Sequence, residues 1–134
     1  MQDRPTAAEL LAVVGSLLEE ELLLAVDGPL QYRTRVAANL VRIVERELLL
    51  GSAALLDERE SLLALLTQAS QDLLPGPLTE QVADLNQSLV NELSSQPLPA
   101  REAAIWTTLM RISKRKLAIV RPGYDRYDAA GETP

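Results

Sequence analysis

The placement of proline, glycine and capping residues most constrains the fold of this chain, because it divides the sequence into segments of helical length. Thr6 followed by Glu9 has the pattern of a capping box, which predicts a first helix from there to about Asp27. Pro29 opens a second helix, and Gly51 is expected to end it in a left-handed conformation. The residues between these points are mostly leucine and others of high helix propensity, so helix is the local preference.

Three further helices follow from the same signals, at about residues 52–72, 79–93 and 99–120. Ser52, Thr79 and Pro99 start them, and the Pro-Gly-Pro stretch at 75–77 separates the first two. A chain of 134 residues with 47% hydrophobic residues can bury one core. The sequence therefore predicts an all-α, single-domain bundle of about five helices over residues 1–124. Residues 125–134 have no apolar periodicity and are expected to form a flexible tail.

Several functions are excluded or disfavoured by what the sequence lacks. It has no histidine and no cysteine, which removes Ser-His-Asp and Cys-His catalysis, histidine-containing di-iron sites and thiol chemistry. Its glycines are isolated, so no phosphate-binding loop is expected. A net charge of -6 opposes nucleic-acid binding, and neither a signal peptide nor an apolar run of roughly 18 residues is recognisable. We expect a cytoplasmic protein that uses no metal, cofactor, nucleic acid or membrane.

On a helical wheel, each predicted helix has an apolar arc that is expected to face the core: Leu10, Val14, Leu17, Leu18 and Ala25 in the first, Val36, Leu40, Ile43, Val44 and Leu48 in the second, and Ile105, Trp106, Leu109, Ile112 and Val120 in the fifth. Four polar side chains fall on or beside these arcs. Glu21 lies in the arc of the first helix and Glu47 in that of the second, with Asn39 at its edge, and Lys116 lies in the arc of the fifth. A buried charge needs a partner, so Lys116 is expected to pair with Glu47 or Glu21 as a structural device. Alternatively, these groups line a pocket between helices as acid, base or anion anchor, or they reach solvent at the bundle ends.

The basic run RISKRK at 111–116 also has two interpretations. Arg111, Lys114 and Arg115 fall on the polar face of the fifth helix, where positive charge near the C-terminus complements the helix dipole. The alternative is a docking site for an acidic partner, or for a phosphate-bearing ligand such as a nucleotide or coenzyme.

The two Leu-Leu-Leu triplets at 22–24 and 48–50 offer more apolar surface than one face of each helix can bury. Leu23 and Leu49 are the excess residues. The sequence therefore predicts self-association, as a symmetric dimer.

Three segments resemble a bacterial domain family of unknown function: MQDRPTAAELL, QYRTRVAANLVRIVERELLLG and KLAIVRPGYDRY. Members of that family tend to be encoded beside acyl-CoA dehydrogenases and phosphotransferases of the aminoglycoside-kinase type, which implies an accessory role near acyl-CoA metabolism. The family pattern implies importance for Arg35, Asn39, Arg46, Glu47, Lys116 and Tyr124. The pattern has Asn-Pro before the tyrosine, whereas this chain has Arg121 and Pro122 in that region, so the role of that asparagine does not carry over.

Two function classes remain. The first is a helical interaction protein that docks on a partner encoded nearby, either the phosphotransferase or the dehydrogenase. The second is a small-molecule binder or enzyme with an inter-helix pocket lined by Glu21, Glu47 and Lys116. The candidate polar cluster comprises Glu21, Arg35, Asn39, Arg46, Glu47, Lys116 and Tyr124.

Overall fold

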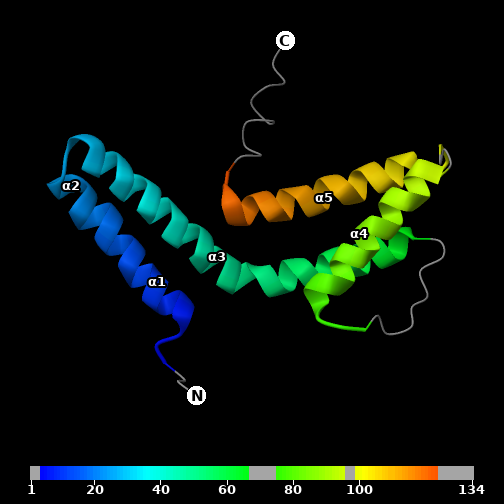
Figure 1. Cartoon of the computed structure of the whole chain (residues 1–134), viewed down its shortest axis with the longest axis horizontal. Helices are drawn as coiled ribbons and strands as arrows, with labels where there is room; N and C mark the ends of the chain where they lie inside the picture. The colour runs from blue at the N-terminus through cyan, green and yellow to red at the C-terminus, as the bar shows by residue number, and fades with distance from the viewer. Residues whose placement is uncertain (1–3, 67–74, 96–98, 124–134) are drawn as a thin grey trace, which may run out of the picture.

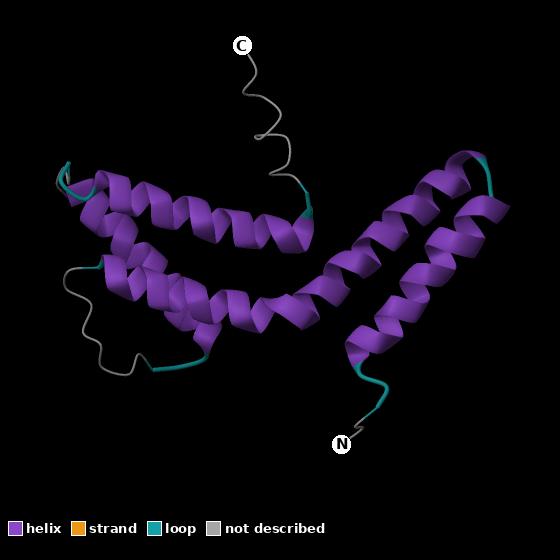
Figure 2. Ribbon diagram, turned by 180° about the vertical axis from the view of Figure 1, so that it is seen from behind, coloured by secondary structure: helices purple, strands orange, loops and turns teal. Residues whose placement is uncertain are grey.

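The structure, a computed structural model, describes residues 4–66, 75–95 and 99–123. Over these ranges every regular element is a helix and no strand is present, which confirms the predicted all-α single domain. The helices form an open, extended arrangement in which α3 is common to both ends of the molecule (Figure 1; Figure 2). None of the helices in these ranges is long and apolar enough to cross a membrane.

The N-terminal rod consists of three helical segments that follow one another without a gap: α1 (Ala7–Ser16), the π-helical segment η1 (Leu17–Leu22) and α2 (Leu23–Ala25). The predicted capping box at its start is confirmed. Thr6 Oγ1 accepts from the Glu9 N–H at 3.2 Å, and Glu9 Oε2 accepts from the Thr6 N–H at 2.7 Å. The chain then turns through Gly28, whose φ of 55° lies in the left-handed region that glycine tolerates.

Helix α3 (Gly28–Leu65) is a single helix of 38 residues, so the predicted break at Gly51 is wrong. Gly51 and Ser52 are both interior helical residues, and Gly51 is not among the glycines with positive φ. A glycine inside a helix costs about 1 kcal/mol relative to alanine, which is small beside the packing gained on both sides of it. The helix also ends at Leu65 rather than near Asp72, and Asp72 itself lies outside the described residues.

Helix α3 changes direction near its middle (Figure 1; Figure 2). Gly51 and Ser52 lie in the interior of this helix, and Gly/Ser pairs are among the recognised causes of helix bending. The residues that sequence reasoning assigned to a helix end therefore lie inside one continuous, bent helix.

Helices α4 (Leu78–Ser95) and α5 (Glu102–Val120) pack against the second half of α3, and both agree with their predicted ranges. Together the three helices enclose the core. Its buried members are Leu62, Leu65, Val82, Leu85, Leu89, Ile105 and Ile112. Trp106 and Val120, expected in the buried arc of the last helix, are exposed instead.

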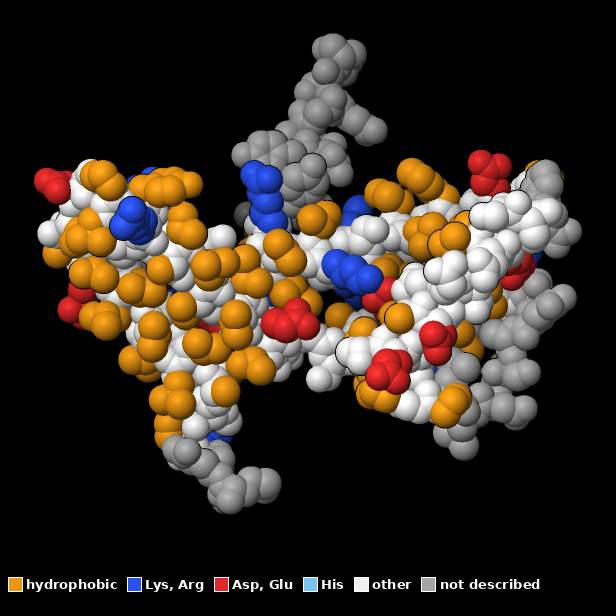
Figure 3. Space-filling model, viewed as in Figure 1, with side chains coloured by type: hydrophobic (Ala, Val, Ile, Leu, Met, Phe, Trp, Pro, Cys, Tyr) orange, Lys and Arg blue, Asp and Glu red, His pale blue; other side chains and the backbone are white. Residues whose placement is uncertain are grey.

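The first half of α3 packs mainly against the N-terminal rod, and the two together form a helical hairpin; Arg46 also contacts the end of α5. Gly15, Thr34 and Ala38 are buried there. The apolar arcs predicted for this region are largely exposed, namely Leu10, Val14 and Leu17 on the rod and Val36, Leu40, Val44 and Leu48 on α3. Two helices can cover only one side of each other, so the arcs would need a third element that the described residues do not supply. Figure 3 shows apolar side chains gathered over this half of the molecule.

Candidate functional site

The candidate polar cluster separates into two pockets. Glu47 and Lys116 line a pocket between α3 and α5, called here the α3–α5 pocket. Arg35, Asn39 and Arg46 line a second pocket between the hairpin and the end of α5, called here the arginine cleft. Glu21 is exposed and lines neither pocket. Tyr124 lies outside the described residues.

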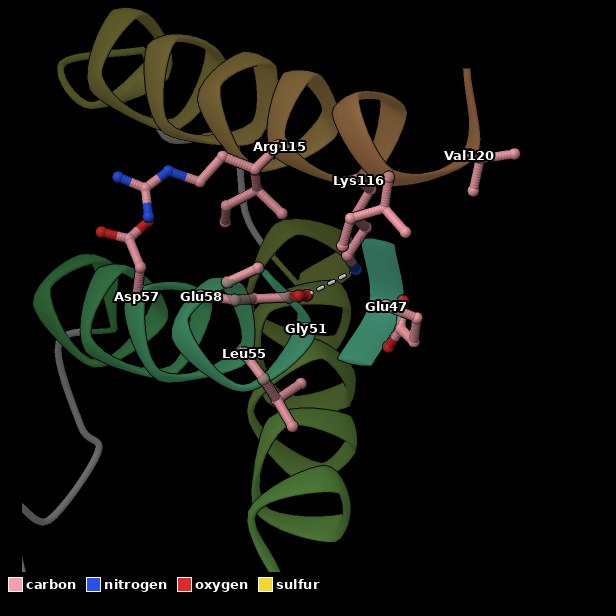
Figure 4. Close-up of a pocket in the computed structure, with 11 residues that line it drawn as sticks. Glu47, Gly51, Leu55, Asp57, Glu58, Arg115, Lys116 and Val120 are labelled. Carbon is pink, nitrogen blue, oxygen red and sulfur yellow. Dashed lines mark hydrogen bonds and ion pairs between the residues drawn. The ribbon is translucent and has the colours of Figure 1, made fainter. Parts of the chain in front are cut away.

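The α3–α5 pocket has a volume of about 260 Å³ and a largely apolar wall. Leu55 of α3 and Ile112, Ile119 and Val120 of α5 form the apolar part. The polar part is formed by Glu47, Asp57, Glu58, Arg115 and Lys116, as the close-up in Figure 4 shows. Small-molecule pockets usually measure about 300 to 1,000 Å³, so this one is suited at most to a small ligand.

The partner of Lys116 is Glu58, and the predicted pairing with Glu47 or Glu21 is wrong. Lys116 Nζ donates to Glu58 Oε1 at 2.7 Å, and Asn86 Nδ2 of α4 donates to the same oxygen at 3.1 Å. Glu58 is only 3% exposed, whereas the side chain of Lys116 is 60% exposed. The contact therefore joins a buried carboxylate to a lysine that reaches in from the surface. It forms a polar layer that links α3, α4 and α5.

Glu47 is exposed at the edge of the α3–α5 pocket, so its predicted inward orientation is wrong. No ion pair or hydrogen bond joins its side chain to any described residue, and the dashed line in Figure 4 runs from Lys116 to Glu58. Its Oε1 lies 2.7 Å from the position that a Cβ on Gly51 would occupy.

The basic run of α5 is paired with an acidic stretch of α3. Arg111 and Arg115 both contact Asp57, at 3.4 and 3.1 Å, and Arg111 also donates to Ser61 Oγ at 2.7 Å. With Lys116 on Glu58, three of the run's basic residues hold α5 against α3. These pairs give Arg111 and Arg115 a structural role, while the role at the helix dipole and the alternative of a docking site both stay predictions.

The arginine cleft is lined by residues spaced along one face of α3: Arg35, Asn39, Arg42 and Arg46. Arg42 crosses to the rod, where it contacts Glu19 Oε2 at 2.7 Å, and it also contacts Glu45 at 2.9 Å. The hydrogen bond from Arg42 lowers the pKa of Glu19, and the same pairs raise the pKa of Arg42. Arg42 therefore has an electrostatic partner on each side.

Arg46 and Arg35 differ from Arg42 in their partners. Arg46 Nε donates to the Ile119 carbonyl at 2.6 Å, a group left unpaired by the end of α5. Arg35 makes no hydrogen bond or ion pair with any described residue. Arg121 completes the cleft from the α5 side. The cleft thus brings together guanidinium groups from two distant parts of the sequence.

The family model for a domain of unknown function, DUF6285, matches residues 24–124. The chain belongs to this family. The DUF6285 region begins in α2, after α1 and η1, and contains every residue that lines the α3–α5 pocket. It contains the arginine cleft as well, except for Glu19 and Leu23. Comparison with curated proteins and with solved structures finds no match.

Sequence reasoning missed the residue at the centre of the polar layer in this DUF6285 domain. Glu58 lies in register with Leu55, Leu62 and Leu65, so it occupies an apolar arc that a helical wheel of this segment displays. The regular spacing of Arg35, Asn39, Arg42 and Arg46 is likewise visible in the sequence. The contact of this row with the end of α5 is visible only in the structure.

Proposed function

We propose that this protein is a helical interaction module whose N-terminal hairpin binds a second copy of itself. The observation that carries the proposal is the apolar face of the hairpin, formed by exposed Leu10, Val14, Leu17, Leu40, Val44 and Leu48. Exposed apolar surface that is gathered in one place marks an interaction site rather than an ordinary monomer surface. Figure 3 shows such surface over α1 and the first half of α3.

The polar contacts of the hairpin support the assignment of these residues to one face. Arg42 reaches Ser16 and Glu19 of the rod, which defines the polar flank of the helix pair. Val44 is two residues from Arg42, so it points to nearly the opposite side of α3, and Leu40 and Leu48 lie one turn on either side of it. The apolar face is therefore separate from the arginine cleft.

A second copy is the occupant that the surface favours, because two-fold pairing covers the same patch on both chains at once. Burying a half-exposed aliphatic side chain gains about 1 kcal/mol, so six on each copy gain about 12 kcal/mol. An association cost near the low end of the accepted range, about 4 kcal/mol, leaves roughly 8 kcal/mol, which is the free energy of a micromolar dimer.

The test is sedimentation equilibrium from about 1 to 100 µM, a range that spans the estimated affinity. The wild type should shift from monomer to dimer, and Val44→Glu should remain monomeric because it buries two carboxylates at the interface. Val90→Glu is the matched control, since Val90 on α4 is 54% exposed and Val44 is 50% exposed. A wild type that stays monomeric at 100 µM, or an equal effect of both variants, would refute the proposal.

The proposal extends to a partner enzyme. The resemblance stated above supports a phosphotransferase or dehydrogenase of acyl-CoA metabolism as that partner, docked on the resulting dimer. Co-purification of tagged wild type with each purified enzyme, compared with Val44→Glu, tests this extension. If neither enzyme is recovered at protein concentrations of tens of micromolar, the proposed enzyme partner is refuted, and the self-association result is unaffected.

The alternative, a binder or enzyme that uses the α3–α5 pocket, is less well supported. The pocket is small, Glu21 is absent from it, and the Glu58 carboxylate already accepts from Lys116 and Asn86. A general acid or base must exchange a proton with a substrate, and the contacts from Lys116 and Asn86 already occupy the Glu58 carboxylate.

A further inference from the structure

We propose that the arginine cleft is a binding site for a small organic phosphate. Four arginines and one glutamate line it, which gives a formal charge of +3 in a chain whose net charge is -6. Such a concentration of positive charge against the sign of the whole molecule attracts anions locally. The cleft has a volume of about 670 Å³, within the usual range for a bound ligand.

The distribution of partners indicates which groups meet the ligand. Arg42 is held by Glu19 and Glu45, so it shapes the wall. Arg46 uses Nε on the Ile119 carbonyl, and its terminal nitrogens make no hydrogen bond with described residues. Arg35 and Asn39 make no hydrogen bond or ion pair with described residues. Arg35 is therefore the main anchor, with Asn39 and Arg46 beside it.

The chemistry of these donors favours phosphate. Guanidinium groups present paired N–H donors that match the oxygens of a phosphate, and an amide can donate to the same group. Leu23, Ile43 and Val120 add apolar surface to the cleft, which suits an ester with a hydrocarbon or aromatic portion rather than inorganic phosphate alone. The donors and the apolar surface together indicate a small organic phosphate ester.

The construction of the cleft supports a binding role independently of charge. Its walls come from the π-helical segment η1, from α3 and from the end of α5. π-helical turns are rare and occur frequently at functional sites. Here the π-helical segment places Glu19 against Arg42, so the irregular backbone contributes directly to the wall.

The experiment measures binding of phenyl phosphate and of pyrophosphate to the full chain by isothermal titration calorimetry at constant ionic strength. The wild type should bind phenyl phosphate saturably, and Arg35→Ala should weaken binding by about tenfold or more, because a charged hydrogen bond is lost. Arg33→Ala is the matched control. Arg33 is an exposed arginine two residues away on α3, it does not line the cleft, and its loss changes the net charge equally.

Arg33→Ala should change the affinity less than twofold, and pyrophosphate should bind more weakly than phenyl phosphate. Absence of saturable binding by the wild type would overturn the proposal, as would an equal loss in both arginine variants. A phospholipid headgroup offers similar chemistry, so anionic vesicles containing phosphatidylserine are tested in parallel. Arg35-dependent binding to vesicles without binding to phenyl phosphate would overturn the assignment to a dissolved ester.

Discussion

The Glu58–Lys116 contact gives the sharpest stability prediction, through replacement of Lys116 by methionine. The substitution keeps the apolar stem of the side chain and removes the ammonium group. A hydrogen bond to a charged group contributes about 1.5 to 3 kcal/mol, but the side chain of Lys116 is 60% exposed and water screens it. Glu58 also keeps its bond from Asn86. We therefore expect Lys116→Met to lower the free energy of unfolding by about 1 to 2 kcal/mol.

The assay is urea unfolding at one fixed protein concentration, followed by circular dichroism. With a slope near 2 kcal/mol/M, the midpoint should fall by roughly 0.5 to 1 M. Lys114→Met is the control, because Lys114 is exposed on the same helix and has no partner among the described residues; it should change stability by less than about 0.5 kcal/mol.

A double-mutant cycle with Glu58→Gln isolates the contact itself. Glutamine keeps an oxygen for Asn86 and removes the buried charge, so the double variant should be more stable than the sum of the single effects predicts, by about 1 kcal/mol. A coupling energy below about 0.3 kcal/mol, within the usual limits of additivity, would show that Lys116 does not stabilise the buried carboxylate.

Two further predictions concern the glycines of α3 and the Glu19–Arg42 pair. Gly51→Ala should raise the free energy of unfolding by about 0.5 to 1 kcal/mol, because alanine favours a helix interior and the exposed Glu47 carboxylate can rotate away from the new methyl group. Gly28→Ala should lower the free energy of unfolding, because φ is 55° at that position. A lower free energy of unfolding in Gly51→Ala would contradict the continuous helix. The hydrogen bond from Arg42 lowers the pKa of Glu19 from its ordinary 4.5, so its stabilisation is present at neutral pH and is lost as pH falls through the lowered value. Wild type and Glu19→Gln should differ in unfolding free energy by less than about 1 kcal/mol at pH 7. This difference should shrink below pH 4.5, and a difference that grows on acidification would contradict the assignment.

The helices were predictable because local signals determine them. The capping box at Thr6 and Glu9 forms within one turn, and its hydrogen bonds need no distant residue. The continuity of α3 through Gly51 was not predictable in the same way. A glycine ends a helix only if it adopts the left-handed conformation, and tertiary packing on both sides of Gly51 decides against that.

The polar cluster was only partly predictable, for a related reason. A helical wheel assumes a straight helix with one buried side, which holds for Ile105 and Ile112 of α5. It fails for Glu47, because α3 bends and has different neighbours in its two halves. Pairing is a property of three-dimensional register, so the sequence identified Lys116 as a residue in need of a partner but could not select Glu58.

The continuity of α3 has a further consequence for insertions and deletions. One added residue in the middle of this helix would turn everything before it by about 100° relative to everything after it. Arg46 would then no longer face Ile119, and the cleft between α3 and α5 would come apart even though each half kept its own packing. Seven added residues would restore the angle to within about 20° but separate the two walls by about 10 Å. Related chains that keep the cleft should therefore keep the number of residues between Arg35 and Glu58 constant, while the lengths of the other connections vary.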